Sequence, residues 1–150
     1  MKRRMICRIL WAVVGFFPVC LCGCGHEGVS VEGAKGLMDS IEGLVVVDVR
    51  EESEYCGEGG HIPGAVNYPW QTGVLQARYR ELDRDSEILV VCRSGNRSNQ
   101  AAGFLEWRGY TNVYDMGGGM SEWRWERTGC AESSDDADEG PDERGETYNP

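Results

Sequence analysis

The stretch that decides the fold is Ile88-Leu89-Val90-Val91, followed directly by Cys92-Arg93-Ser94-Gly95-Asn96-Arg97-Ser98. The first four residues form a continuous apolar run, which is typical of a strand that is buried on both faces of a parallel sheet. The segment 99–108 then has the pattern of a helix. The sequence therefore predicts a strand, a short polar loop that begins at Cys92, and a helix, in that order.

A cysteine between the end of a strand and the start of a helix is well placed to act as a nucleophile. The first backbone N–H groups of a helix have no intrahelical partner and carry partial positive charge, so they stabilise a thiolate. Arg93 and Arg97 add full positive charge to the same loop. The alternative is an inert, buried structural cysteine, but such a residue needs no cationic loop. The loop therefore predicts a nucleophile within an anion-binding pocket.

The rest of the domain alternates between strand and helix patterns. The expected strands are 44–49, 65–67 and 112–114, and the expected helices are one that Ser30 caps, one over 74–82, and a last one that follows Gly117-Gly118-Gly119 and bears Trp123. This alternation predicts an α/β fold with a parallel sheet that is flanked by helices on both faces. Ligands of such sheets bind beyond the carboxyl ends of the strands, which is where Asp48 and Cys92 fall.

Four segments together resemble the rhodanese family of sulfurtransferases. The loop from Cys92 to Ser98 resembles the active-site loop of that family, and three more segments resemble its signatures in the same order along the chain. These segments are Val46-Val47-Asp48-Val49-Arg50, Gly60-His61-Ile62-Pro63-Gly64-Ala65-Val66-Asn67 and Gly118-Gly119-Met120-Ser121-Glu122-Trp123. The resemblance covers residues 29–128 and implies a single-domain, rhodanese-like fold.

The length of the loop favours sulfur transfer over phosphoryl chemistry. Four residues lie between Cys92 and Arg97, whereas phosphatases and arsenate reductases of similar fold have a longer loop that fits a tetrahedral oxyanion. The shorter loop fits a persulfide whose outer sulfur is surrounded by backbone N–H groups. The resemblance thus implies a thiosulfate sulfurtransferase that moves sulfane sulfur to cyanide or a thiol through a Cys92 persulfide.

The resemblance also implies roles for individual residues. Cys92 is the expected catalytic residue, and the loop that follows it is expected to bind substrate through Arg93, Ser94, Gly95, Asn96, Arg97 and Ser98. Asp48 and Arg50 are expected to support the site structurally, because a charged pair at a buried strand end usually orders a neighbouring loop. His61 is expected to support the site by packing in a turn. A catalytic role for these three residues is the alternative.

The resemblance implies no cofactor, and no ligand cluster with the usual spacing predicts a metal site. Two other functions stay open. One is a non-enzymatic module that binds a partner protein. The other is an extracytoplasmic thiol–disulfide oxidoreductase, which would need Cys92 to cycle with Cys56 or Cys130 and lacks a Cys-x-x-Cys motif.

Residues 1–23 have the pattern of a secretory signal, in which Lys2-Arg3-Arg4 precedes a mostly apolar segment. The segment Leu21-Cys22-Gly23-Cys24 resembles the lipobox of bacterial lipoproteins. Cys24 would then be lipidated and become the mature N-terminus, with residues 24–28 as a tether. Anchoring by the uncleaved apolar segment is the alternative. Either arrangement predicts an extracytoplasmic, membrane-anchored protein, as in a periplasmic or cell-surface lipoprotein.

The chain is acidic, with 15 basic and 25 acidic residues and a formal net charge of −10. This excess argues against nucleic acid as a partner. Residues 131–150 hold eight acids and one base, which predicts a disordered tail after a domain over 29–130. The domain has three cysteines, Cys56, Cys92 and Cys130. A Cys56–Cys130 disulfide would spare Cys92, and three thiols that stay reduced or partly oxidised are the alternative.

Overall fold

The computed structural model describes residues 26–130, so the expected signal segment, Cys24 and the acidic tail lie outside the described residues. The strands are β1 (Glu27–Val29), β2 (Val45–Asp48), β3 (Val66–Asn67), β4 (Ile88–Val91) and β5 (Val113–Met116). The helices are α1 (Val31–Ser40), α2 (Glu52–Tyr55), α3 (Val74–Arg78), α4 (Asn96–Trp107) and α5 (Gly119–Glu122), and a 3₁₀ turn, η1 (Tyr79–Glu81), follows α3.

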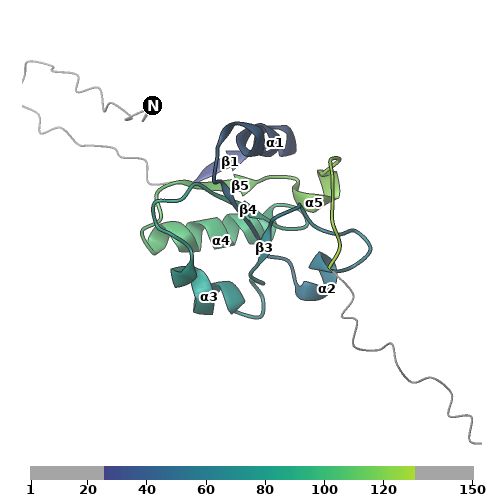
Figure 1. The fold of residues 1–150 in the computed structure, drawn as a ribbon. Coiled ribbons are helices and arrows are strands. Elements are labelled where there is room, and N and C mark those ends of the chain that lie inside the picture. The colour runs from purple at the N-terminus through teal and green to yellow at the C-terminus, as the bar shows by residue number, and fades with distance from the viewer. Residues whose placement is uncertain (1–25, 131–150) are drawn as a thin grey trace, which may run out of the picture.

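The five strands form one sheet in the order β1-β5-β4-β2-β3, and every neighbouring pair is parallel. Strand β4 lies in the middle of the sheet (Figure 1), and its four residues are 0% exposed. The apolar run that predicted a central buried strand is therefore confirmed. Because β4 ends at Val91, Cys92 emerges at the carboxyl edge of the sheet between its two neighbours β5 and β2.

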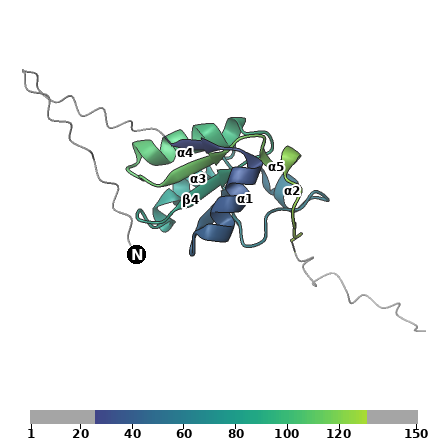
Figure 2. The same cartoon turned by 90° about the horizontal axis from the view of Figure 1, so that it is seen from above.

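Helices cover both faces of the sheet, as Figures 1 and 2 show, so the predicted α/β fold class is confirmed. Side chains of a strand alternate between its two faces. Leu89 and Val91 accordingly pack in a core that includes Val31 of α1 and Met120 of α5. Ile88 and Val90 of β4 point to the other face and pack in a second core. From α3 and α4 this core includes Leu75, Ala101, Ala102 and Leu105. The two cores fix the positions of the helices on either side of β4.

Three predicted helices differ from the structure at one end. The last of them, α5, ends at Glu122, so Trp123 follows it in extended backbone. Helix α4 begins at Asn96 and not at residue 99, because Gly95 precedes it as a cap with a φ of +94°. The three polar residues of this first turn carry no apolar periodicity, so the sequence pattern did not include them. The expected helix 74–82 is α-helical from Val74 to Arg78 and continues as the 3₁₀ turn η1 from Tyr79. At this turn the buried hydroxyl of Tyr110 donates to the carbonyl groups of Tyr79 and Leu82.

The start of the domain also extends beyond the prediction. Glu27 and Gly28, which were expected in the tether, form the edge strand β1 together with Val29 and pair with β5. Such a short strand carries almost no sequence signal, and its pairing partner lies far along the chain. The predicted cap of the next helix is confirmed, because Ser30 Oγ accepts a hydrogen bond of 3.2 Å from Gly33 N. Within residues 26–130, no helix is long and apolar enough to cross a membrane.

Candidate active site

Cys92 lies at the carboxyl end of β4, with its sulfur directed toward the loop that follows. The residue is 1% exposed. Its Sγ accepts a hydrogen bond of 3.1 Å from the backbone N–H of Gly95, and Ser98 Oγ lies 3.4 Å away. The first hydrogen bond of α4 runs from Asn99 N to Gly95 O. The backbone N–H groups before Asn99 therefore have no partner within the helix, and they lie next to the Cys92 loop. The loop thus surrounds this sulfur with groups that stabilise negative charge.

Helix α5 holds the opposite side of the loop in place. The backbone N–H of Met120 donates to Cys92 O over 2.8 Å, and the N–H of Ser121 donates to Arg93 O over 2.9 Å. Gly119 lies so close to the loop that an added Cβ would meet Cys92 O at 2.4 Å, and its φ of +58° is one that side chains rarely adopt. The glycines before Met120 therefore allow α5 to approach the loop closely enough to bind its carbonyl groups.

Arg97 binds a carboxylate of the protein itself. It lies in the first turn of α4, and its guanidinium group donates to both oxygens of Glu54 on α2, over 2.6 and 2.9 Å. This pairing lowers the pKa of Glu54 below its usual value and raises the pKa of Arg97. The predicted role of Arg97 in binding substrate charge stays a prediction, because Glu54 compensates its charge in this structure.

The other loop residues differ in their exposure and in the side-chain hydrogen bonds that they form. Arg93 and Ser94 are exposed, and Arg93 has no carboxylate partner within residues 26–130. The side-chain oxygen of Asn96 accepts a hydrogen bond of 2.7 Å from Gln100 within α4. Among the loop cations, Arg93 is therefore the one whose guanidinium group is available to a bound anion.

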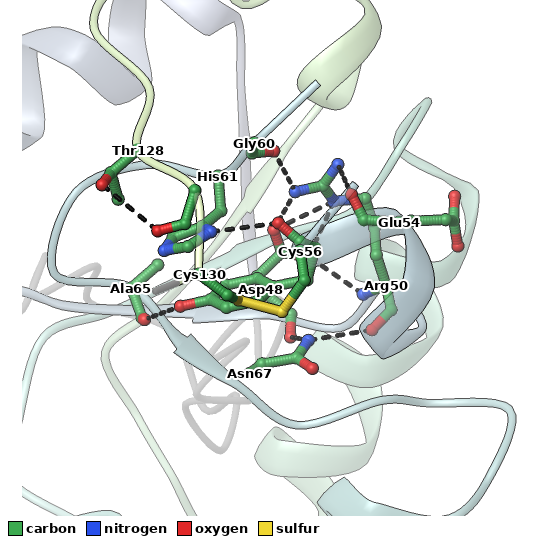
Figure 3. Close-up of a disulfide and its surroundings, with 12 residues drawn as sticks. Asp48, Arg50, Glu54, Cys56, Gly60, His61, Ala65, Asn67, Thr128 and Cys130 are labelled. Atoms are coloured by element: carbon green, nitrogen blue, oxygen red, sulfur yellow. Dashed lines mark hydrogen bonds and ion pairs between the residues drawn. A yellow bond between two sulfur atoms is a disulfide. The ribbon is translucent and has the colours of Figure 1, made fainter. Parts of the chain in front are cut away.

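Asp48 and Arg50 form a buried ion pair at the end of β2, with 2.7 Å between Arg50 Nη2 and Asp48 Oδ2. Arg50 also donates to Glu54 O over 3.1 Å and to Gly60 O over 2.9 Å. Figure 3 shows how these bonds connect the strand end with α2 and with the loop that follows it. The pair thus positions the element that carries Glu54, and the supporting role of Asp48 and Arg50 stays a prediction.

Comparison with known proteins identifies the family to which this chain belongs. Residues 30–126 match the family described as the rhodanese-like domain. The chain belongs to the rhodanese family. Thiosulfate sulfurtransferase GlpE of Pseudomonas entomophila is 41% identical over 83 residues, which cover 55% of this chain and 72% of that protein. The putative sulfur carrier protein YrkF of Bacillus subtilis is 40% identical over 95 residues, which cover 63% of this chain and 49% of that protein.

Solved structures share the same fold. The rhodanese-like domain from Anabaena sp. superimposes with a TM-score of 0.61 at 22% identity, over 83% of this chain and 94% of that chain. A rhodanese-related protein from Thermoplasma volcanium has a TM-score of 0.56 at 30% identity, over 65% of this chain and 90% of that chain. The sequence resemblance to single-domain rhodaneses is therefore confirmed, although the chain spans only about half the length of YrkF.

In this rhodanese-like domain, His61 has the surroundings of a packing residue. Its Nδ1 lies 3.0 Å from Tyr55 O, and because a carbonyl oxygen can only accept, Nδ1 carries the proton. The ring stacks on Tyr55 with 3.6 Å between the centroids. The backbone of His61 pairs with Thr128 near the end of the described chain (Figure 3). His61 therefore packs against Tyr55 and Thr128, and its supporting role at the site stays a prediction.

A disulfide joins Cys56, directly after α2, to Cys130 (Figure 3). Cys92 is the free cysteine of residues 26–130. Of the two cysteine arrangements that the sequence left open, the structure has the one that spares the nucleophile. A redox cycle between Cys92 and either of the other two cysteines would first require this disulfide to open.

Sequence reasoning missed several residues around the rhodanese loop. Glu54 and Arg127 carry no motif that marks them, but Glu54 pairs with Arg97, and both residues line a pocket together with Arg93. Gly119 was part of a quoted signature, but its close approach to the loop could not be read from the sequence. Residues 26–130 contain no group of three or more histidine, cysteine, aspartate or glutamate side chains that could hold a metal ion.

Proposed function

We propose that this rhodanese-like protein is a sulfurtransferase that carries sulfane sulfur as a persulfide on Cys92. The observation that carries the proposal is the setting of Cys92 Sγ, which receives the Gly95 N–H at the start of α4 while the other two cysteines of the described chain are bonded to each other. The names of the relatives GlpE and YrkF agree with sulfur transfer. Thiosulfate is the donor we propose.

The reaction has two steps on one sulfur atom. The Cys92 thiolate attacks the outer sulfur of thiosulfate, the sulfur–sulfur bond of the donor breaks, and sulfite leaves with the electron pair. Gly95 N–H and the free amides of α4 stabilise the negative charge that the persulfide then carries. Cyanide or a thiolate next attacks the outer sulfur, which breaks its bond to Cys92 and restores the thiolate. The two steps balance without a cofactor.

The test is the intact mass of the purified protein before and after treatment with thiosulfate. We expect a gain of one sulfur atom that is lost when cyanide is added, with thiocyanate released in equal amount. Cys92→Ser should fold and gain no sulfur, because a hydroxyl group is a far weaker nucleophile than a thiolate. Cys56→Ser/Cys130→Ser is the control: it leaves Cys92 as the cysteine of residues 26–130 and, once shown to be folded, should still gain sulfur. Protein that gains no sulfur, or a Cys92→Ser variant that does, would refute the mechanism.

We further propose that the protein is a lipoprotein anchored outside the cytoplasm through Cys24. The Cys56–Cys130 disulfide supports this location, because structural disulfides persist mainly in oxidising compartments. Cys24→Ala should abolish labelling by a fatty-acid probe in cells, whereas Cys20→Ala should not. Unchanged labelling of Cys24→Ala would overturn the proposed anchor.

A further inference from the structure

Trp107, the last residue of α4, lies on the surface of the domain outside both cores. Its side chain is 75% exposed, whereas Val66, the other large apolar side chain that is exposed within residues 26–130, is 37% exposed. A single exposed apolar residue is not a site by itself. Its neighbours decide what it contacts, because an indole ring joins a large apolar area to a polar N–H and is enriched where water meets an apolar phase.

The guanidinium group of Arg108 lies against three aromatic rings at the end of α4. Its Cζ is 4.4 Å from the ring centre of Trp107, 5.0 Å from that of Phe104 and 4.9 Å from that of Tyr79. Its Nε has no hydrogen-bond acceptor, and no carboxylate of residues 26–130 pairs with the group. The rings hold this cation in position through cation–π attraction and leave its terminal N–H groups to other acceptors, such as phosphate oxygens.

Two more arginines extend this surface. Arg84 and Arg80 are exposed, and each lies over a tyrosine ring, at 5.7 and 5.2 Å. Arg84 adjoins the end of α4, because a Cβ on Gly109 would meet its Nη1 at 2.8 Å. Asp83 and Asp85 are in the same turn, but no ion pair within the described chain involves either arginine. The arginine–tryptophan surface is defined here by Arg80, Arg84, Trp107 and Arg108.

The chain enters the domain beside this surface. His26, the first described residue, has its Nδ1 2.9 Å from Glu106 Oε2, and a Cβ on Gly103 would lie 3.9 Å from its Cε1. Gly103 precedes Trp107 by four residues, and residues four apart share one face of a helix. Cys24 precedes His26 by two residues, which span at most about 7 Å. A lipid on Cys24 would therefore be attached close to Trp107.

We propose that the arginine–tryptophan surface docks on the membrane that carries the Cys24 anchor. Trp107 lies in the headgroup region, and the three arginines contact the phosphate groups of anionic lipids. The inference rests on the proposed anchor and adds the face by which the domain lies on the bilayer. A weak contact suffices for this docking, because the anchor holds the surface at a high effective concentration next to the lipids.

Docking in this way determines where Cys92 points. Helix α4 has 12 residues, which corresponds to a length of about 18 Å, and it has Trp107 at one end and the Cys92 loop at the other. Figure 1 shows α2 and α5 at the right of the domain, whereas α4 extends to the left. The nucleophile thus faces the aqueous compartment, so its sulfur donor arrives from water and not from the lipid phase.

The test places the processed protein on vesicles. The full chain is produced in bacterial cells, purified in detergent and reconstituted into vesicles of phosphatidylethanolamine and phosphatidylglycerol that contain a dibrominated phospholipid. Bromine quenches the emission of a tryptophan that enters the bilayer interface. We expect native protein to be quenched and Trp107→Phe to lose most of this quenching. Trp125→Phe is the matched control and should keep it, because Trp125 follows α5 and packs against Trp123.

Lipid charge tests the arginines separately. Replacing phosphatidylglycerol with phosphatidylcholine should lower the ratio of docked to undocked protein by about fivefold or more, since an anionic surface gives about that factor for each basic residue near it. Arg84→Gln should lower the same ratio on anionic vesicles. Arg124→Gln is its control, because Arg124 is exposed but lies outside the arginine–tryptophan surface. Trp107 and Arg84 are both exposed, so their substitutions should leave the fold intact, which unfolding in urea checks.

The outcomes separate this inference from the proposed anchor. Protein that incorporates no fatty-acid label and does not stay with the vesicles overturns the anchor and the docking surface together. Labelled protein that stays with the vesicles without quenching, or whose quenching survives Trp107→Phe, refutes the docking surface while the anchor stands, and it leaves the exposed ring to contact with a partner protein. Equal quenching on neutral and anionic vesicles refutes the binding of lipid phosphate by the arginines.

Discussion

The pair between Glu54 and Arg97 should make α2 and α4 energetically dependent on each other. The two hydrogen bonds measure 2.6 and 2.9 Å, and the side chains are 30% and 17% exposed, respectively. Hydrogen bonds to charged groups contribute about 1.5–3 kcal/mol, whereas fully exposed ion pairs contribute about 0.2–1 kcal/mol. Since this pair is bidentate and partly buried, we expect a coupling free energy of about 1.5 kcal/mol between the two residues.

A double-mutant cycle measures this coupling. Glu54→Gln, Arg97→Gln and the double variant are unfolded in urea, with tryptophan fluorescence as the signal, and the coupling is the non-additive part of the free energies of unfolding. The matched control is the pair Arg78–Glu81, which is also bidentate but whose side chains are 50% and 51% exposed. Because solvent screens that exposed pair, it should give a clearly smaller coupling. A Glu54–Arg97 coupling no larger than the control would refute the reasoning.

The same pair gives a pH signature. The hydrogen bond from Arg97 lowers the pKa of Glu54 in the folded protein. A carboxylate with a depressed folded pKa contributes stability that is fully present above its unfolded pKa of about 4.3 and is lost as the pH falls through the folded value. Native protein should therefore lose more stability than Glu54→Gln when the pH falls from about 5 to 3. Parallel acid titrations of the two proteins would contradict the assignment.

Two further substitutions test the disulfide and the close approach of Gly119 to the Cys92 loop. Cys56→Ser removes a disulfide whose cysteines lie 74 residues apart in the sequence. Because the open chain gains conformational entropy when it unfolds, the free energy of unfolding should fall by about 4 kcal/mol. A loss under about 1 kcal/mol in urea would contradict this expectation. Gly119→Ala should destabilise the protein and slow persulfide formation, because its Cβ would meet Cys92 O at 2.4 Å and Arg93 C at 2.5 Å. Gly43→Ala is the control, since its φ is also positive but nothing lies within 4 Å; equal effects of the two alanines on stability and on sulfur uptake would show that backbone strain alone is responsible.

The parts of the fold that could be predicted are those that a continuous segment determines. Four apolar residues identified β4 because a strand buried on both faces has no polar alternation. The polar loop after Val91 could be interpreted chemically because its residues are neighbours in sequence, and Gly95 and Ser98 do contact the sulfur. Ser30 marked the start of α1 because its own side chain caps the helix.

The parts that escaped prediction depend on contacts between distant segments. Glu54 reaches Arg97 across 43 residues, and Arg127 reaches Gly59 across 68 residues. No local pattern records such a contact, and sequence alone therefore assigned the charge of Arg97 to the substrate without the carboxylate that compensates it. The pairing of Cys56 with Cys130 was likewise one option of two, because cysteine counts do not fix connectivity.

The disulfide described above closes residues 57–129 into a covalent ring that contains Cys92. Hydrolysis of any single peptide bond inside the ring opens it without releasing a fragment, since the two pieces stay joined through Cys56 and Cys130. A protease that cut between the exposed residues 58 and 59 would thus leave β4 attached to the rest of the sheet. The nick would appear as two bands in a denaturing gel only after reduction, so a cut molecule keeps Cys92 in place.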